Sequence, residues 1–307
     1  MSMLAGDILN DRYVINKKLG SGSFGYVYSG KDQENIFHMI AIKIEKPNPK
    51  QMNISYLYNE YNVYRFLNNN HQGFPKFYHF QKSFDNERKF IIIEQLYRNL
   101  NQLFDMCEQR FTFDTILEIA IQIIARIETL HSIGFIHRDL KPENFMIGFP
   151  QTQQYRIIHL IDFGLCQRYR NPYTMEHFSP SCHNRVVGSM LFMSCNSHFQ
   201  LKQSRRDDLE SLAYLLLYFL NGKNLPWNTN SANAFAKNNP LQHCRKVGSM
   251  KQCLTPDELF KNHSKVFANF LSYVRNLDFT DEPDYEMIRS EFIKFKSKKE
   301  IKFSWES

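Results

Sequence analysis

The sequence predicts an α+β protein in which a small β-rich lobe precedes a larger helical lobe. Before about residue 97, short runs rich in β-branched and aromatic residues are typical of strands. Beyond that point, apolar residues recur every three or four positions, which is typical of one face of a helix. We therefore expect one domain over residues 1–307, with an N-terminal lobe at about 11–97 and a C-terminal lobe at about 98–300.

The N-terminal lobe is expected to be a small sheet that carries one helix. Runs of β-branched and aromatic residues predict strands at 11–16, 25–29, 39–44 and 90–94. The segment 55–67 is the expected helix.

The C-terminal lobe is expected to be built around long helices. Apolar residues between 113 and 130 share one helical face. Residues 208–220 are apolar almost all round, which predicts a helix buried in the middle of the lobe. Asparagine-rich stretches at 68–70 and 228–239 predict loops.

Composition and charge fit a globular protein and argue against a nucleic-acid partner. Of 307 residues, 43% are hydrophobic and 22% are charged, as in ordinary globular proteins. The net charge is +7, but the basic residues are scattered, so a solvated surface explains them better than a nucleic-acid groove. We expect protein partners only and a chain that can act as a monomer; a larger protein assembly is left open.

Cysteine spacing and hydropathy bear on the compartment. The six cysteines show no C-x-x-C pair and no zinc-ligand spacing. The N-terminal residues lack the apolar run of a signal peptide, and the most apolar stretch, 212–220, is too short to span a bilayer. We expect free thiols, no membrane and a cytoplasmic location, with the nucleus or cytoskeleton as alternatives.

Two short motifs indicate phosphoryl transfer. The string His-Arg-Asp-Leu-Lys-Pro-Glu-Asn lies at 137–144, and Asp-Phe-Gly follows at 162–164. Transfer of a phosphoryl group from ATP needs a residue that orients the attacking hydroxyl, a cation for the developing charge, and oxygen ligands for magnesium. The two motifs supply these groups in the order found in protein kinases, which the chain therefore resembles.

Each of these tasks has a candidate residue. Asp139 is expected to accept the hydrogen bond of the substrate hydroxyl, and Lys141 to meet the developing charge. Asn144 and Asp162 are expected to hold Mg²⁺ through oxygen, which is the ligand that this ion prefers. An ordinary turn aspartate is the alternative for Asp162, and the presence of Asp139 upstream disfavours it.

A glycine pattern at 20–27 is expected to cover the ATP phosphates. Gly20, Gly22 and Gly25 fit G-x-G-x-x-G-x-V, and without a Cβ their backbone amides can approach phosphate oxygens. The same spacing occurs in dinucleotide sites, but these need a helix directly afterwards, whereas residues 26–28 continue as a strand. A plain hairpin turn is the other alternative.

Lys43 is expected to reach the α- and β-phosphates of ATP. It ends the string Ile-Ala-Ile-Lys, which is this chain's version of a kinase strand motif. Such a lysine needs a carboxylate to position it. Glu60, on the expected helix, is the preferred partner, and Glu45, on the strand face of Lys43, is the alternative.

Longer strings resemble the casein kinase I family of Ser/Thr protein kinases. In place of the usual Ala-Pro-Glu motif, Ser-Cys-Asn at 194–196 is similar to that family's Ser-Ile-Asn. The resemblance runs from about residue 13 to 296. It rests on Asp-Phe-Gly-Leu-Cys-Gln-Arg-Tyr-Arg at 162–170, Ser-Arg-Arg-Asp-Asp-Leu-Glu-Ser-Leu at 204–212, Leu-Pro-Trp at 225–227, Leu-Asp-Phe at 277–279 and Glu-Pro-Asp-Tyr at 282–285.

The resemblance implies a bilobal protein kinase fold and an ATP- and Mg²⁺-dependent transferase. It implies that Asp208 anchors the backbone of the catalytic loop. It also implies that Glu94 and Leu96 offer backbone groups to adenine, with Ile93 as gatekeeper. The residues expected to contact ATP are Gly20, Ser21, Gly22, Ser23, Phe24, Gly25, Val27, Ala41, Lys43, Glu94 and Leu96.

The chain departs from the family at several positions. Gly-Ser-Met-Leu-Phe at 188–192 stands where the family has Gly-Thr-Ala-Arg-Tyr, so Leu191 replaces an arginine of the family's anion site. Lys202 replaces a glutamate and Ala213 a glycine. The expected function is a Ser/Thr protein kinase with weakened recognition of phosphate-primed substrates; the alternative is a kinase-shaped scaffold with little turnover. Part of the positive field is expected to persist on Arg185 and, in a later loop, on Arg245, Lys246 and Lys251.

Overall fold

The structure is a computed structural model that describes two compact units. The first comprises Met1–Tyr97 with Met146–Leu165, and the second comprises Arg98–Phe145 with Cys166–Ser307. The description covers residues 3–22, 25–36, 38–46, 55–82, 89–182, 186–228, 239–298 and 301–306. The expected single domain and its lobe bounds stay a prediction.

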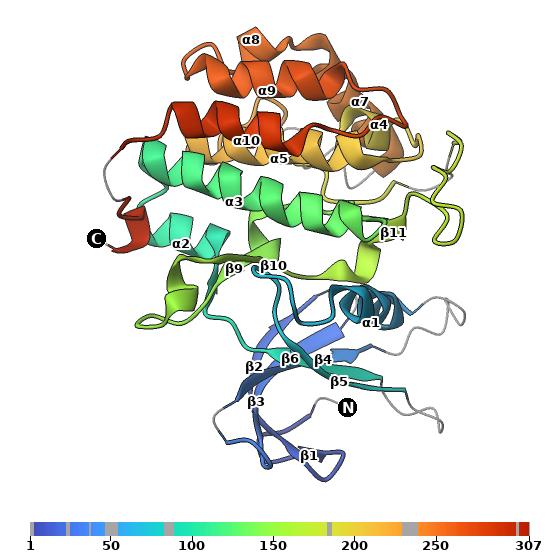
Figure 1. Ribbon diagram of the computed structural model, residues 1–307, viewed down its shortest axis with the longest axis vertical. Helices are drawn as coiled ribbons and strands as arrows, with labels where there is room; N and C mark the ends of the chain where they lie inside the picture. The colour runs from blue at the N-terminus through green and yellow to red at the C-terminus, as the bar shows by residue number, and fades with distance from the viewer. Residues whose placement is uncertain are drawn as a thin grey trace. The chain divides into compact units, whose positions relative to one another are not determined.

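The first unit contains an antiparallel sheet with strand order β1-β2-β3-β4-β6-β5 (Figure 1). Neighbouring strands in the middle of the sheet pair in regular register, as in Val27 opposite Lys43 and Lys43 opposite Ile91. The strands are β1 (Ile8–Leu9), β2 (Tyr13–Ser21), β3 (Gly25–Asp32), β4 (Met39–Glu45), β5 (Phe77–Gln81) and β6 (Phe90–Glu94); β10 (Ile158–Leu160) belongs to the same unit.

Side-chain alternation explains why these residues form a sheet. Ile15, Ile40, Ile42 and Ile92 are almost completely buried and form a core on one face. Gly30 is required where two strands approach closely, because an added Cβ would lie 2.6 Å from Ile42 Cδ1 and 2.7 Å from the Val14 carbonyl oxygen.

One helix, α1 (Tyr56–Leu67), belongs to this unit, as predicted. Ser55 caps it by accepting a hydrogen bond from the Tyr58 amide, and Asn68 ends it in the left-handed conformation. The helix packs against the short 3₁₀ helix η3 (Phe163–Leu165). There the ring of Phe163 meets Tyr64 edge-on at 5.1 Å, so α1 and the Asp-Phe-Gly motif form one packed assembly.

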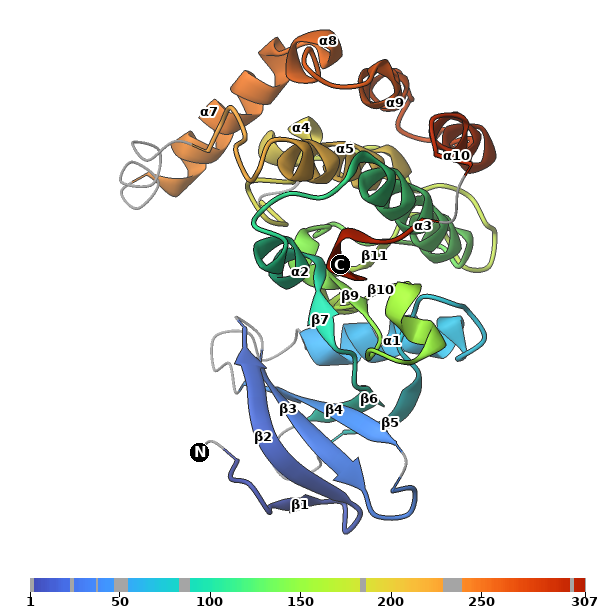
Figure 2. The same cartoon turned by 90° about the vertical axis from the view of Figure 1, so that its left-hand side faces the viewer.

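The second unit is mostly helical, and α5 is its core. All but two residues of α5 are buried, and the helix packs against α3 and α9 while α10 packs on α3 (Figure 2). The helices are α2 (Leu100–Met106), α3 (Phe113–Ser132), α4 (Cys195–His198), α5 (Arg205–Leu220), α7 (Pro240–Cys253), α8 (Pro256–Leu259), α9 (Lys265–Arg275) and α10 (Tyr285–Lys294). Shorter elements are β7 (Arg98–Asn99), β8 (Phe135–Ile136), β11 (Gln167–Arg168), η1 (Pro142–Asn144) and η4 (Ser304–Glu306), with β9 (Phe145–Ile147) and η2 (Gln153–Arg156) preceding β10.

These elements confirm the α+β class and the predicted helices and strands. The expected loop at 68–70 follows α1, whereas most of the expected loop at 228–239 lies outside the described residues. All six cysteines are free. Within the described ranges, no helix has the length and apolar character needed to cross a membrane.

Candidate active site

The loop that carries Asp139 is held in place by a buried carboxylate. Asp208, in the first turn of α5, accepts hydrogen bonds from the amides of His137 at 2.7 Å and Arg138 at 2.9 Å. Arg138 has a positive φ of 69°, a strained conformation for a side-chain-bearing residue that the surrounding contacts must maintain. The expected anchoring role of Asp208 therefore has a geometric basis.

Asp208 stays charged although it is buried. Burial alone would raise its pKa, but hydrogen bonds from His131 and from the His137 amide lower the pKa of Asp208 below its ordinary value. Burial also lowers the pKa of His131, so this imidazole is neutral. It donates from Nε2 to Asp208 at 2.9 Å and accepts at Nδ1 from the Tyr285 hydroxyl at 2.6 Å.

Three predicted residues meet in the catalytic loop of the second unit. Lys141 Nζ lies 2.6 Å from Asp139 Oδ2. The side-chain amide of Asn144 donates to the Asp139 carbonyl at 2.8 Å, which leaves its oxygen as the atom that can bind a metal ion. Ser189 donates to Asp139 Oδ1 at 2.7 Å. Because donors hold both carboxylate oxygens, the orientation of Asp139 is set before any substrate binds.

Lys43, Glu60 and Asp162 meet in the first unit. Lys43 Nζ lies 2.5 Å from Glu60 Oε2 and 2.6 Å from Asp162 Oδ1. Burial opposes a charge on this lysine, but the carboxylates of Asp162 and Glu60 outweigh that effect and raise the pKa of Lys43 above its ordinary value. Lys43 is therefore a fixed positive charge.

Glu45, the alternative carboxylate partner of Lys43, makes its contacts at the beginning of α1. Glu45 accepts hydrogen bonds from the Ser55 hydroxyl at 2.8 Å and the Leu57 amide at 3.2 Å. It also lies 3.6 Å from the ammonium of Lys89. Glu45 thus fixes the beginning of α1, the helix that delivers Glu60.

The Asp-Phe-Gly motif is held by a residue that the sequence reasoning missed. Asp162 has a positive φ of 65°, which is a strained conformation at a candidate metal ligand. The side-chain amide of Asn59 donates to the carbonyls of Phe163 at 3.3 Å and Gly164 at 3.0 Å. The only signal in the sequence was that Asn59 directly precedes Glu60.

The glycine pattern fits a phosphate-binding loop. An added Cβ at Gly20 or Gly22 would meet no atom within 4 Å, so the protein's own packing does not require glycine there. A Cβ at Gly25 would lie 2.3 Å from the Ile44 carbonyl oxygen, so Gly25 is required by the sheet. Ser21 ends β2, while Ser23 and Phe24 lie outside the described residues.

The remaining candidate ATP contacts lie along the inner strands. Val27 is half-buried in β3, and Ala41 is buried in β4. Glu94 ends β6, where its carboxylate accepts from the Lys76 amide at 3.1 Å, and Leu96 follows as a buried residue. Their roles toward adenine stay predictions.

Two of the departures from the family acquire a structural explanation. Lys202 donates to the Ser179 carbonyl at 3.1 Å, and its ammonium lies 5.1 Å from the centre of the Phe178 ring. Lys202 therefore stabilises the position of residues 178–179. Ala213 is fully buried in α5, where alanine favours a helix more than glycine does.

The expected residual positive field needs a correction. Lys251 does not lie in a loop: it is in the last turn of α7 and is completely buried. Arg245 and Lys246 lie on the exposed face of the same helix, and Arg185 lies outside the described residues. The prediction was wrong because Arg245, Lys246 and Lys251 belong to one helix, which turns Lys251 toward the protein interior.

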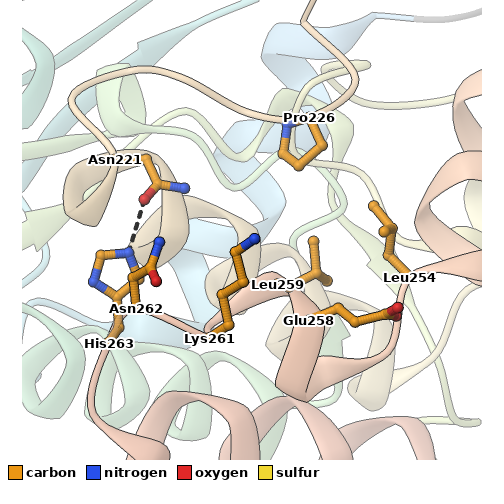
Figure 3. A pocket seen from close by; sticks show the side chains of 8 residues that line it. All are labelled: Asn221, Pro226, Leu254, Glu258, Leu259, Lys261, Asn262 and His263. Carbon is orange, nitrogen blue, oxygen red and sulfur yellow. Dashed lines mark hydrogen bonds between the residues drawn. The ribbon is translucent and has the colours of Figure 1, made fainter.

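A pocket of about 400 Å³ in the second unit contains none of the residues assigned to catalysis, ATP or Mg²⁺ (Figure 3). It is lined by eight residues, among them Pro226 and Lys261. Two of its polar groups satisfy each other, since His263 Nε2 lies 2.7 Å from Asn221 Oδ1. Among the described residues, no group of three or more His, Cys, Asp or Glu side chains could hold a metal ion.

Comparison with known proteins agrees with this geometry. Residues 13–291 match the family described as the protein kinase domain, so the chain belongs to the protein kinase family. Within it, the chain is 35% identical over 285 residues to casein kinase I homolog 2 of Schizosaccharomyces pombe, covering 93% of this chain and 62% of that protein. It is 38% identical over 282 residues to casein kinase I homolog RAG8 of Kluyveromyces lactis, covering 92% of this chain and 50% of that protein.

These relatives confirm the resemblance to casein kinase I. A third, casein kinase I homolog 2 of Saccharomyces cerevisiae, is 37% identical over 92% of this chain and 49% of its own length. The chain thus spans between 49% and 62% of the length of these three relatives. Members of the protein kinase family generally use ATP and Mg²⁺.

The ion pair of Lys43 gives a first prediction. Glu60→Gln removes the negative charge that faces Lys43, and hydrogen bonds to charged groups are worth about 1.5–3 kcal/mol, so kcat/KM for ATP should fall by about 10- to 100-fold. Glu45→Gln is the matched control, because glutamine still offers an acceptor oxygen to Ser55 and Leu57. Steady-state kinetics with varied ATP would measure both. A larger loss in Glu45→Gln than in Glu60→Gln would contradict the assignment.

Proposed function

We propose that this protein is a Ser/Thr protein kinase that transfers the γ-phosphoryl group of ATP to protein hydroxyls. The observation that carries the proposal is the setting of Asp139. Its carboxylate oxygens are held by Lys141 and Ser189, its carbonyl by Asn144, and its loop by Asp208. Phosphoryl transfer needs positioning and charge more than covalent chemistry, and this setting supplies both.

Asp139 acts on the substrate hydroxyl. One carboxylate oxygen accepts the hydroxyl hydrogen bond, which aims the attacking oxygen and later gives the proton a destination. Lys141, 2.6 Å from the same carboxylate, places a positive charge where negative charge develops. The products are ADP and a phosphorylated serine or threonine.

The first unit supplies the nucleotide-binding groups. Lys43 offers a fixed ammonium to the phosphates, and Gly20 and Gly22 carry no Cβ that would obstruct a phosphate approaching the backbone. Asp162 of this unit and Asn144 of the second unit are each proposed as an oxygen ligand for Mg²⁺. When bound, this ion neutralises charge on the phosphate oxygens.

A scaffold with little turnover is the rejected alternative. A protein selected only for binding has no need of an ammonium held between two carboxylates, or of a strained loop that presents an aspartate. Lys43 and Asp139 have these surroundings. The function is tested by a radiolabelled-ATP assay on a panel of unprimed, acidic and phosphate-primed peptides, with robust transfer as the expected result.

Replacing Asp139 tests the mechanism. Asp139→Asn should lower kcat by about 10²- to 10⁴-fold, the range for loss of a positioned acid–base group. ATP affinity should stay near the parent value, because Asp139 faces the hydroxyl and not the nucleotide. The exposed Asp257→Asn serves as a control for surface charge. Parent-like turnover in Asp139→Asn would overturn the role assigned to this residue.

We further propose that recognition of phosphate-primed substrates is weak. A phosphoserine brings about −1.5 to −2 charges and three acceptor oxygens, which cationic donors meet best. Leu191 offers an aliphatic side chain at the family's anion site. The nearby ammonium of Lys251 is buried and bound to backbone carbonyls, so it cannot substitute for the missing arginine.

Restoring the arginine is the corresponding test. Leu191→Arg should raise kcat/KM for phosphate-primed peptides by about tenfold, the gain from one charge-assisted hydrogen bond of about 1.5 kcal/mol. Unprimed peptides should be used as before, which makes them the internal control. Strong selectivity of the parent for primed peptides, unchanged by Leu191→Arg, would show that other residues build the anion site.

A further inference from the structure

Three backbone carbonyls of one short segment converge on a buried ammonium in the second unit. Lys251 Nζ donates to the carbonyl oxygens of Met190 at 3.2 Å, Leu191 at 3.1 Å and Met193 at 2.8 Å. The lysine is completely buried. A lysine ammonium has three protons to donate, and this one gives all of them to a single short segment.

Trp227 holds the same segment from a second side. Its indole Nε1 donates to the Leu191 carbonyl at 2.9 Å. Its ring centre lies 4.8 Å from Lys251 Nζ, and the ring of Tyr214 lies 4.5 Å from it, so aromatic faces also stabilise the buried charge. Trp227 belongs to the Leu-Pro-Trp string, to which the proposed mechanism of phosphoryl transfer assigns no role.

The charged groups around Lys251 are themselves paired. Arg275 donates to the Lys251 carbonyl at 2.7 Å and to the Tyr214 hydroxyl at 3.1 Å. Glu210 accepts from the same hydroxyl at 2.5 Å. Burial lowers the pKa of Lys251 to about 7, and the carboxylate of Glu210 acts in the opposite direction. The three carbonyl oxygens and the aromatic rings also favour the charged form, because they supply acceptors and negative ring faces inside the protein.

The segment that Lys251 holds begins at the catalytic loop. Gly188 has a φ of 106°, and an added Cβ there would lie 2.5 Å from the Arg138 carbonyl oxygen. The next residue, Ser189, donates to Asp139. One end of the segment thus touches the residue that orients the hydroxyl, while Lys251 and Trp227 hold the other end.

We propose that Lys251 and Trp227 are positioning residues for the protein substrate. They fix the backbone of residues 190–193 and, through Ser189, the orientation of Asp139. We call these contacts of Lys251 and Trp227 with residues 190–193 the latch. The groups assigned to ATP belong to other parts of the chain, so loss of the latch lowers kcat/KM for the peptide and leaves nucleotide binding intact. This inference deepens the proposed function and rests on it.

The test compares Lys251→Met and Trp227→Phe with the parent. Lys251→Met leaves buried carbonyls without a donor, and kcat/KM for a peptide at saturating ATP should fall by about 10- to 100-fold. Trp227→Phe keeps an aromatic ring but loses one donor, so its loss should be smaller. Lys265→Met, at the exposed start of α9, is the control and should behave like the parent. Equilibrium binding of ATP should be unchanged in all of them.

Two kinetic results would overturn the latch. One is a parent-like peptide kcat/KM in Lys251→Met; the other is an equal loss of peptide use and ATP affinity, which indicates general damage. Should Lys251→Met fail to fold, Trp227→Phe carries the test alone. In that case, a peptide kcat/KM equal to that of the parent overturns the proposal. If the parent binds ATP but phosphorylates no peptide, the proposed function fails. In that case, hydrogen exchange at residues 188–194 still tests the latch. The amides of this segment must exchange faster in Lys251→Met, or in Trp227→Phe if the first variant does not fold, than in the parent.

Discussion

The carboxylate of Asp208 is the interaction on which the catalytic loop depends. Its oxygens accept hydrogen bonds from the amides of His137 and Arg138, and the neutral imidazole of His131 binds it from α3. Hydrogen bonds to a charged acceptor are worth about 1.5–3 kcal/mol each. Together they can hold Arg138 at positive φ, a conformation that costs on the order of 1–3 kcal/mol, and so present Asp139.

The two units use the same physical device for different ends. In the first, an ammonium, Lys43, is fixed by two carboxylates and becomes a permanent charge. In the second, a carboxylate, Asp139, is fixed by an ammonium and a hydroxyl. Groups held in this way need little reorganisation when a substrate arrives, which is the basis of electrostatic catalysis.

Much of this site could be predicted from local strings because the chemistry restricts residue type and spacing. Asp139, Lys141 and Asn144 lie within one loop, and Lys43 was identified by its strand. The choice of Glu60 over Glu45 depended on placing one helix correctly. The hydrogen bonds of Ser189 and Lys251 join residues 50 to 61 positions apart, and no local pattern marks such pairs. The prediction for Lys251 was wrong because this residue lies on the buried side of α7 and not in a loop.

The most direct test of the central claim is hydrogen exchange of the catalytic loop in Asp208→Asn. Asparagine at this position can still accept a hydrogen bond at its one side-chain oxygen. Its NH₂ group replaces the second oxygen and cannot accept from the backbone N–H that this oxygen bound. We predict faster exchange of the His137 and Arg138 amides together with a loss of phosphoryl transfer, while the sheet of the first unit exchanges as in the parent. Unchanged protection of these two amides would contradict the view that Asp208 holds the loop.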